Sequence, residues 1–364
     1  MKKFIFLLIL LITSEAYSQV DYVELYLKNK ISLYSISQEF SSKSKYRELY
    51  EILSRILEKT NSFEVLIEKI KIGFGLGIDV NKELLMAFSN NLIENYKYLP
   101  IFQSKNLVSN FSEFLIREKE TNQTVIYQFS KLCLTYNYIE PLVNLATNTS
   151  ITNEEVISQL VSKLFSFNMF SNVVKIYDKY KGIISFDTED LITIGRSMAN
   201  IGDERSITLL EQDIPYFLPY RVEALVKLGY IDEAVNEIKT YGINARSALW
   251  AFTALLNKEE YNLCQTSLIY INDINLRSYL SIILNFLTKN DIIETERKLK
   301  ELLKKRDVNL SIKNQIAIIL WIINTSENIK EMKKEIIFSY NYLNGIKTSN
   351  FYSERVLEKI RNFR

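Results

Sequence analysis

The chain of 364 residues contains no histidine, the side chain that proteins use most often for acid–base catalysis and for binding metals. Its absence excludes Ser-His-Asp and Cys-His catalysis. The two cysteines, Cys133 and Cys264, stand far apart in the sequence and cannot by themselves complete a zinc ligand set. No calcium loop of the Asp-x-Asp-x-Asp-Gly type is present. The sequence therefore predicts no metal and no other cofactor.

Without histidine, carboxylates are the side chains of this sequence that could still catalyse a reaction. Glycoside cleavage, for example, requires only two of them. The fragment nearest to the catalytic Glu-Ser of the soluble lytic transglycosylases is Ser353-Glu354, in reverse order and followed by an ordinary amphipathic pattern. The glycine cluster at 73–77 lacks the Gly-Lys-Ser/Thr and the preceding strand of a phosphate loop, so we interpret it as a helix end. We predict that the protein is not an enzyme.

Helices are expected nearly throughout, because apolar residues recur at helical spacing and only 9 Gly and 4 Pro interrupt them. Before the repeats begin, the spacing predicts helices over 21–37, 46–59, 62–72 and 81–96. Proline is best tolerated in a first helical turn. Pro215 and Pro219 therefore place a helix start near 215–220, and we expect the same role for Pro100 and Pro141.

A short phrase recurs along the chain, in which a small or polar turn residue precedes a new helical pattern. Its turn positions are separated by 31, 34, 27, 28 and 33 residues, and they fall at 137, 168, 202, 229, 257 and 290. A period of this size, built from paired helices, indicates a solenoid. The predicted fold is all-α, a right-handed superhelical solenoid of antiparallel helix pairs.

The clearest unit covers 218–241. Gly229 can adopt a positive φ in the turn, Asp232 and Glu233 suit the first turn of the next helix, and the small Ala234 allows the helices to approach. The segment 228–234 resembles the turn of a tetratricopeptide repeat, and so does 201–207, where an isoleucine replaces the usual alanine.

This resemblance covers about residues 120–305 and implies an array of helical hairpins. In such an array the first helix of each pair would line the concave face. The residues that this frame would expose to a partner are Tyr127, Lys131, Glu155, Arg196, Tyr216, Glu223 and Arg277.

The first residues carry the pattern of a secretory signal peptide. Lys2 and Lys3 precede the apolar run 4–12, and Ala16-Tyr17-Ser18 supplies small residues for cleavage after Ser18. We divide the chain into the signal peptide 1–18, less regular hairpins over 19–120, the tetratricopeptide-like array over 121–306 and basic capping helices over 307–364. The expected location is the periplasm or the exterior of a bacterial cell, and no later stretch is long and apolar enough to span a membrane.

Export makes a disulfide conceivable, but in a solenoid each repeat touches only its neighbours, so the sequence predicts two separate buried thiols.

Charge is distributed unevenly along the chain, since residues 289–364 contain 16 Lys/Arg and 10 Asp/Glu. A basic patch there could bind an anionic surface or glycan, or could be the solvated face of a helix. Its residues are Arg297, Lys298, Lys300, Lys304, Lys305 and Arg306. Export argues against a nucleic-acid partner.

These observations favour an exported scaffold that holds a protein partner in an envelope or surface assembly. Two alternatives remain open, namely an envelope enzyme that cleaves glycans through carboxylates and a scaffold that binds glycans. Two Asp/Glu converging in a deep pocket would indicate the enzyme. A row of aromatic residues along the groove would indicate glycan binding.

Overall fold

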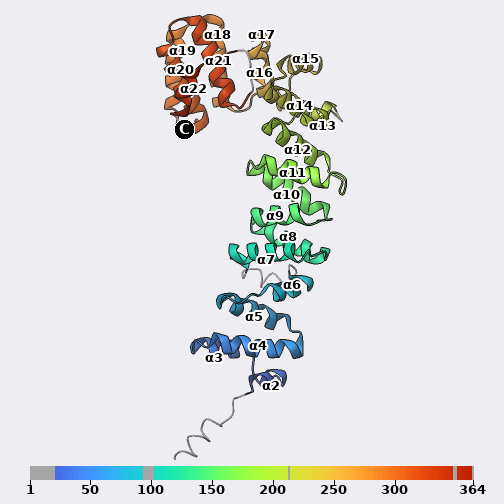
Figure 1. Ribbon diagram of the computed structural model, residues 1–364. Coiled ribbons are helices and arrows are strands. Elements are labelled where there is room, and N and C mark those ends of the chain that lie inside the picture. Colours follow the sequence, from blue (N-terminus) through green and yellow to red (C-terminus); the bar gives the residue numbers. More distant parts are fainter. Residues whose placement is uncertain (1–20, 93–101, 212–213, 347–350, 363–364) are drawn as a thin grey trace, which may run out of the picture. The chain divides into compact units, whose positions relative to one another are not determined.

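The computed structural model describes residues 21–92, 102–211, 214–346 and 351–362, apart from the side chains of residues 214 and 215 (Figure 1). These residues form 21 α-helices and contain no strand, so the all-α prediction is confirmed. They pack as two compact units that divide after Leu160. The predicted signal peptide, Pro100 and residues 93–96 lie outside the described residues.

Unit 1 covers the described residues up to Leu160. Its core includes a cluster of phenylalanine rings in which Phe88 stacks on Phe111 with centroids 5.1 Å apart and Phe129 meets both edge-on. Its helices are α2 (Tyr22–Leu27), α3 (Leu33–Ser42), α4 (Tyr46–Thr60), α5 (Phe63–Gly75), α6 (Asn81–Ser89), α7 (Lys105–Arg117), α8 (Gln123–Thr135), α9 (Ile139–Asn148) and the start of α10 (Glu154–Ser166).

Unit 2 covers the described residues from Val161 onwards. One continuous apolar core runs through it from Leu218 on α14 to Ile360 on α22. Its helices after α10 are α11 (Phe170–Tyr180), α12 (Thr188–Ile201), α13 (Arg205–Leu209), α14 (Ile214–Leu228), α15 (Ile231–Tyr241), α16 (Ala248–Asn257), α17 (Tyr261–Ile269), α18 (Ile274–Lys289), α19 (Ile292–Lys304), α20 (Leu310–Thr325), α21 (Ile329–Leu343) and α22 (Glu354–Arg361).

The predicted turn positions adopt the left-handed backbone conformation that ends a helix. Five of the six have φ between 57° and 88°, namely Asn137, Asn168, Gly202, Gly229 and Asn290. In four of these five turns the next N–H donates to the carbonyl five residues earlier, as Tyr230 does to Leu225 at 2.8 Å. This is the Schellman bond, which satisfies a carbonyl that the helix end leaves free. The sixth turn lies two residues later than predicted, at Glu259 with φ 57°.

Helices that precede three of these turns, and α20 further along the chain, begin with a side-chain cap. Oxygens of Asn122, Asp187, Asp273 and Asn309 accept hydrogen bonds from backbone N–H groups in the first turns of α8, α12, α18 and α20. Such caps satisfy donors that a helix start leaves unpaired. In α8, α12 and α18 polar or glycine residues therefore define both ends of the helix, whereas α16 has no side-chain cap.

Three local predictions are wrong. The helix expected over 81–96 ends at Ser89, and Asn91 follows it with a positive φ of 55°. The single helix expected over 21–37 is broken into α2 and α3, because Asn29 takes a positive φ of 54° and Ser32 caps a new helix. Pro219 was expected in a first turn, but it lies inside α14, which already begins at Ile214. Pro141 does lie in the first turn of α9, as predicted.

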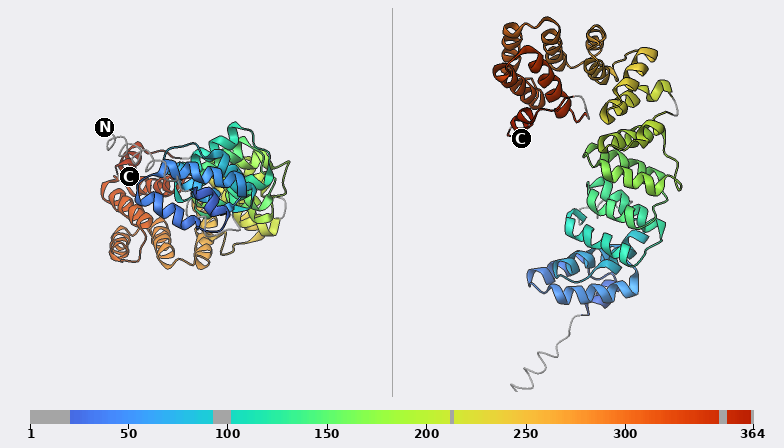
Figure 2. Two further views of the ribbon diagram at one scale, coloured as in Figure 1. Left: turned by 90° about the horizontal axis from the view of Figure 1, so that it is seen from below. Right: turned by 45° about the horizontal axis from the view of Figure 1, so that its top comes forward.

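Unit 2 contains a packing that joins helices far apart in sequence. α16 lies against α21, where Thr253 Oγ1 and Tyr340 Oη are 2.9 Å apart and both buried. Beside them the carboxamides of Asn257 and Asn341 hydrogen-bond to each other. The C-terminal helices, orange and red, lie next to one another in both views of Figure 2. Unit 2 is therefore not held together by neighbouring hairpins alone.

Candidate interaction surface

All seven residues predicted to face a partner lie on helices that precede a left-handed turn, namely α8, α10, α12, α14 and α18. In unit 1 the Lys131 ammonium on α8 contacts the Glu155 carboxylate on α10 and lies 5.8 Å from the centre of the Tyr127 ring. In unit 2, Arg196 on α12 pairs with Glu223 on α14. Arg277 is half-buried, and no ion pair of its side chain is found within the described part of unit 2.

Glu223 is the centre of the best-defined group. Its side chain is 4% exposed and accepts hydrogen bonds from two cations, Arg196 Nε at 3.0 Å and Lys227 Nζ at 2.7 Å. Lys227 also donates to Asn200 Oδ1 at 2.9 Å. A carboxylate buried to this degree requires such partners, because removing it from water is costly unless it is paired. Glu223 therefore positions Arg196 and Lys227 and is itself inaccessible to a ligand.

Aromatic rings flank both cations. The Arg196 guanidinium lies over Phe165 of α10 at 5.0 Å and over Tyr220 of α14 at 5.6 Å. The Lys227 ammonium lies 4.9 Å from the centre of the Trp250 ring on α16. These seven residues, which come from four helices of unit 2, are called the cation–aromatic ladder below: Phe165, Arg196, Asn200, Tyr220, Glu223, Lys227 and Trp250.

The ladder presents a partly exposed, net positive surface. Arg196 retains 33% of its side-chain exposure and Lys227 13%, whereas the one carboxylate between them is covered. Arginine, tyrosine and tryptophan are the residues that most often dominate binding energy at protein interfaces. The stacking also holds the long cationic side chains in place, which lowers the entropy lost when a partner binds.

Sequence reasoning found Arg196 and Glu223 but missed the five other members. A signal was available, because several contacts in this region join residues that are 27 positions apart. Arg196 with Glu223, Asn200 with Lys227, and Glu189 with Tyr216 all show this offset. It equals the spacing between the turn glycines Gly202 and Gly229. Pairing each polar residue with the residue 27 positions further along the chain would have predicted these contacts.

Half of the basic patch belongs to an ion-paired face of α19. On α19, Arg297 donates to Glu294 at 2.7 Å and to Glu301 at 2.5 Å, and Lys298 also lies 3.1 Å from Glu294. Lys300 pairs with Glu296 at 2.6 Å. The arginine lowers the pKa of Glu294 to about 2. Lys304, Lys305 and Arg306 are exposed at the end of the helix.

Two hollows of unit 2 are not lined by acidic residues. One of about 310 Å³ lies between α15 and α17, where Lys239 is its only charged lining residue. Another of about 300 Å³ is formed by α20, α21 and α22 and has no charged lining residue. Across the described residues no group of three or more Cys, Asp or Glu is placed to share a metal ion.

Within the described part of the chain, no helix combines the length and the apolar character needed to cross a bilayer. Both cysteines are buried free thiols, as predicted.

No protein-family model matches the chain, and a search of curated proteins finds no similar sequence.

Proposed function

We propose that the protein is an exported helical-repeat scaffold whose cation–aromatic ladder binds a protein partner in a bacterial envelope or surface assembly. The single observation that supports this most is the buried Glu223 carboxylate, which holds Arg196 and Lys227 side by side on neighbouring helices. The two cations offer several N–H donors to the carbonyl and carboxylate oxygens of a polypeptide.

The repeat architecture is consistent with this role. Left-handed turns recur every 27 to 34 residues, and the ladder uses only helices that precede such turns. We further propose that the pairs are antiparallel and wind as a right-handed superhelix of the tetratricopeptide type, with the ladder on the concave face. The signal-peptide pattern of residues 1–18 is the basis for export.

A glycan-binding role is the second candidate, because Phe165, Tyr220 and Trp250 place aromatic rings on three helices in the same region. Sugars stack on open ring faces, whereas one face of each of these rings is covered by a cation. A polypeptide partner, which can accept hydrogen bonds from those cations, therefore suits the ladder better.

The test is affinity capture from an envelope extract with the chain from residue 19 onwards, followed by identification of what is retained. Arg196→Ala leaves Glu223 paired with Lys227, so the fold should persist while a main contact is lost. We expect recovery of the partner to fall about tenfold or more, as for an interface hot spot.

Arg205→Ala is the matched control, because Arg205 is an exposed arginine of the same unit that pairs with Asp178 and Asp203 and lies outside the ladder. Equal recovery with wild type, Arg196→Ala and Arg205→Ala would contradict the proposal. Retention of glycan in place of protein, measured by co-sedimentation with cell-wall polysaccharide, would favour the second candidate.

A further inference from the structure

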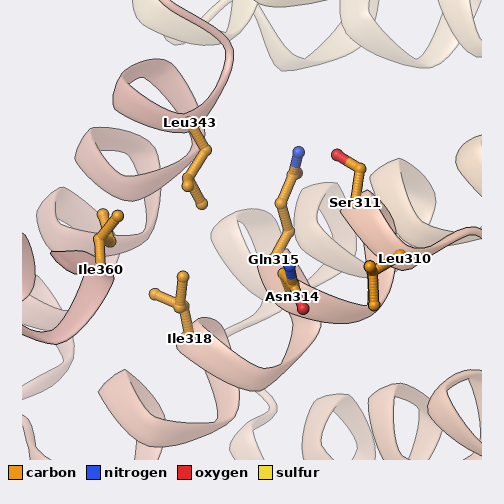
Figure 3. A pocket seen from close by; sticks show the side chains of 7 residues that line it. All are labelled: Leu310, Ser311, Asn314, Gln315, Ile318, Leu343 and Ile360. Carbon is orange, nitrogen blue, oxygen red and sulfur yellow. The ribbon is translucent and has the colours of Figure 1, made fainter. Parts of the chain in front are cut away.

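A second site in unit 2 is formed where α20, α21 and α22 meet. It is a hollow of about 300 Å³ (Figure 3). Ligand pockets in proteins range from about 300 to 1,000 Å³, so this one is sized for one or two side chains. Its lining residues are Leu310, Ser311, Asn314, Gln315, Ile318, Leu343 and Ile360.

The Gln315 side chain is the unusual member of this lining. The residue is 7% exposed, and its Oε1 is buried without a hydrogen-bond partner among the described residues. Figure 3 shows the Gln315 side chain extending between Leu343 and Ser311, with its amide nitrogen outermost. Buried side-chain acceptors are nearly always satisfied, and leaving one unpaired costs free energy. A group that enters the hollow with an N–H or O–H donor would satisfy this oxygen.

The rest of the lining restricts the chemistry of that group. Ile318 and Ile360 are each 1% exposed and form apolar walls, and Leu310 stands at the edge with 73% of its surface exposed. The lining contains no charged side chain, so an ion would lose its hydration without compensation. The ligand must therefore be neutral and mostly apolar where it enters.

A glutamine carboxamide offers one acceptor oxygen and one donor nitrogen next to each other, whichever way the amide is turned. The N–H and C=O of one residue in an extended peptide present the complementary pair. We propose that this hollow binds an apolar residue of a polypeptide, with the side chain between Ile318, Leu343 and Ile360 and the backbone amide hydrogen-bonded to Gln315. The inference rests on the proposed function only in that the ligand is a polypeptide.

The test uses N-acetyl-leucine N-methylamide as a minimal peptide probe, with NMR detection of the Gln315 side-chain amide and the Ile318 and Ile360 methyl groups. N-acetyl-alanine N-methylamide lacks the apolar side chain, and isobutyl acetate lacks the amide. We expect the leucine probe to shift all three sets of signals, and both controls to bind about tenfold more weakly, the size of one or two lost hydrogen bonds or a few buried methyl groups.

In Gln315→Leu the leucine probe should also bind about tenfold more weakly, with a melting temperature at or above that of wild type because an unpaired buried atom is removed. Gln159→Leu, on α10, is the matched control and should bind as wild type does. The proposal is overturned if no probe shifts these signals, if isobutyl acetate binds as tightly as the amide, or if Gln315→Leu retains full affinity.

An experiment that contradicts the Gln315 site can be distinguished from one that contradicts partner binding at the cation–aromatic ladder. Arg196→Ala should leave binding of the leucine probe unchanged, because the ladder does not contribute to this lining. A chain that loses its captured partner through Arg196→Ala but binds no peptide probe at Gln315 would keep the proposed function and lose this inference.

Discussion

The carboxamides of Asn257 and Asn341 hydrogen-bond to each other in both directions, at 3.1 and 2.7 Å, although 84 residues separate them in the sequence. Asn341 is 1% exposed, and the neighbouring Thr253–Tyr340 pair is buried as well. α16 is thereby joined to α21, the second-last helix of the described chain. A buried amide pair of this kind stabilises one arrangement of the helices, because any other register leaves polar atoms unpaired.

We predict that Asn257 and Asn341 are energetically coupled. Replacing either one by alanine leaves the other carboxamide without its partner and should lower the free energy of unfolding by about 1 to 3 kcal/mol. The double variant should cost less than the sum of the two, with a coupling of about 1 kcal/mol. Urea unfolding of the four proteins gives these values. Additive losses would show that the pair does not link α16 to α21.

Gly195 of α12 should not tolerate a larger side chain. A Cβ atom at this position would lie 2.7 Å from Leu210 Cγ and 2.8 Å from Leu210 Cδ2, and Leu210 is fully buried. Overpacking of this kind costs about 1 to 3 kcal/mol, more than the gain of about 0.5 to 1 kcal/mol from removing a glycine inside a helix. Gly195→Ala should therefore lower the melting temperature.

Gly182→Ala serves as the control for this change, because a Cβ atom there meets nothing within 4 Å. Its melting temperature should equal that of wild type or exceed it slightly. If Gly195→Ala were as stable as Gly182→Ala, the close approach of α12 to Leu210 would be refuted.

Arg205 should control the acid titration of two aspartates. Its hydrogen bonds lower the pKa of Asp178 and the pKa of Asp203 below the usual value. A folded-state pKa below the unfolded value means that the stabilisation is fully present above about pH 4 and is lost as the pH falls through the folded pKa. In Arg205→Ala both pKa values should rise, as followed by carboxyl ¹³C NMR, and stability should fall less steeply below pH 4. Unchanged pKa values would exclude these ion pairs in solution.

The two thiols should be unreactive in the folded protein. Cys133 and Cys264 are buried in different units, and burial raises the pKa of the Cys264 thiol to about 12 and the pKa of Cys133 well above its usual value. Because the thiolate is the reactive form, a disulfide reagent at pH 8 should label neither site under native conditions. In guanidinium chloride it should label both. Rapid native labelling of one cysteine would show that its unit opens locally.

Local signals in the sequence predicted the helices and most of their ends. Asn and Gly ended helices at five of the six positions where the repeating phrase placed a turn, because a left-handed turn depends on one residue and its neighbours along the chain. The helix over 46–59 corresponds to α4, and the pattern around Ser353-Glu354 corresponds to α22 with Val356, Leu357 and Ile360 buried. The break at Asn29 was missed because the apolar spacing continues across it.

The candidate surface was predicted only in part. Arg196 and Glu223 were chosen from their positions in the predicted repeats, and both were expected to be exposed to a partner. The structure separates them, since Glu223 is buried and holds the cations whereas Arg196 remains partly exposed. Lys227 and Trp250 escaped notice because their contact joins residues 23 positions apart, outside the spacing of 27 to 34 residues between the turns.

The sequence by itself determined that this protein is helical, with paired helices and left-handed turns. The reason is that turns and apolar spacing are interactions within a few residues of each other. Only the tertiary structure decided that α16 meets α21, that one carboxylate is buried between two cations, and that Gln315 is left without a partner. The α16–α21 contacts join residues 84 and 87 positions apart, for which a single sequence carries no local signal. The repeat spacing relates Arg196 to Glu223, but it does not indicate which of the two is buried.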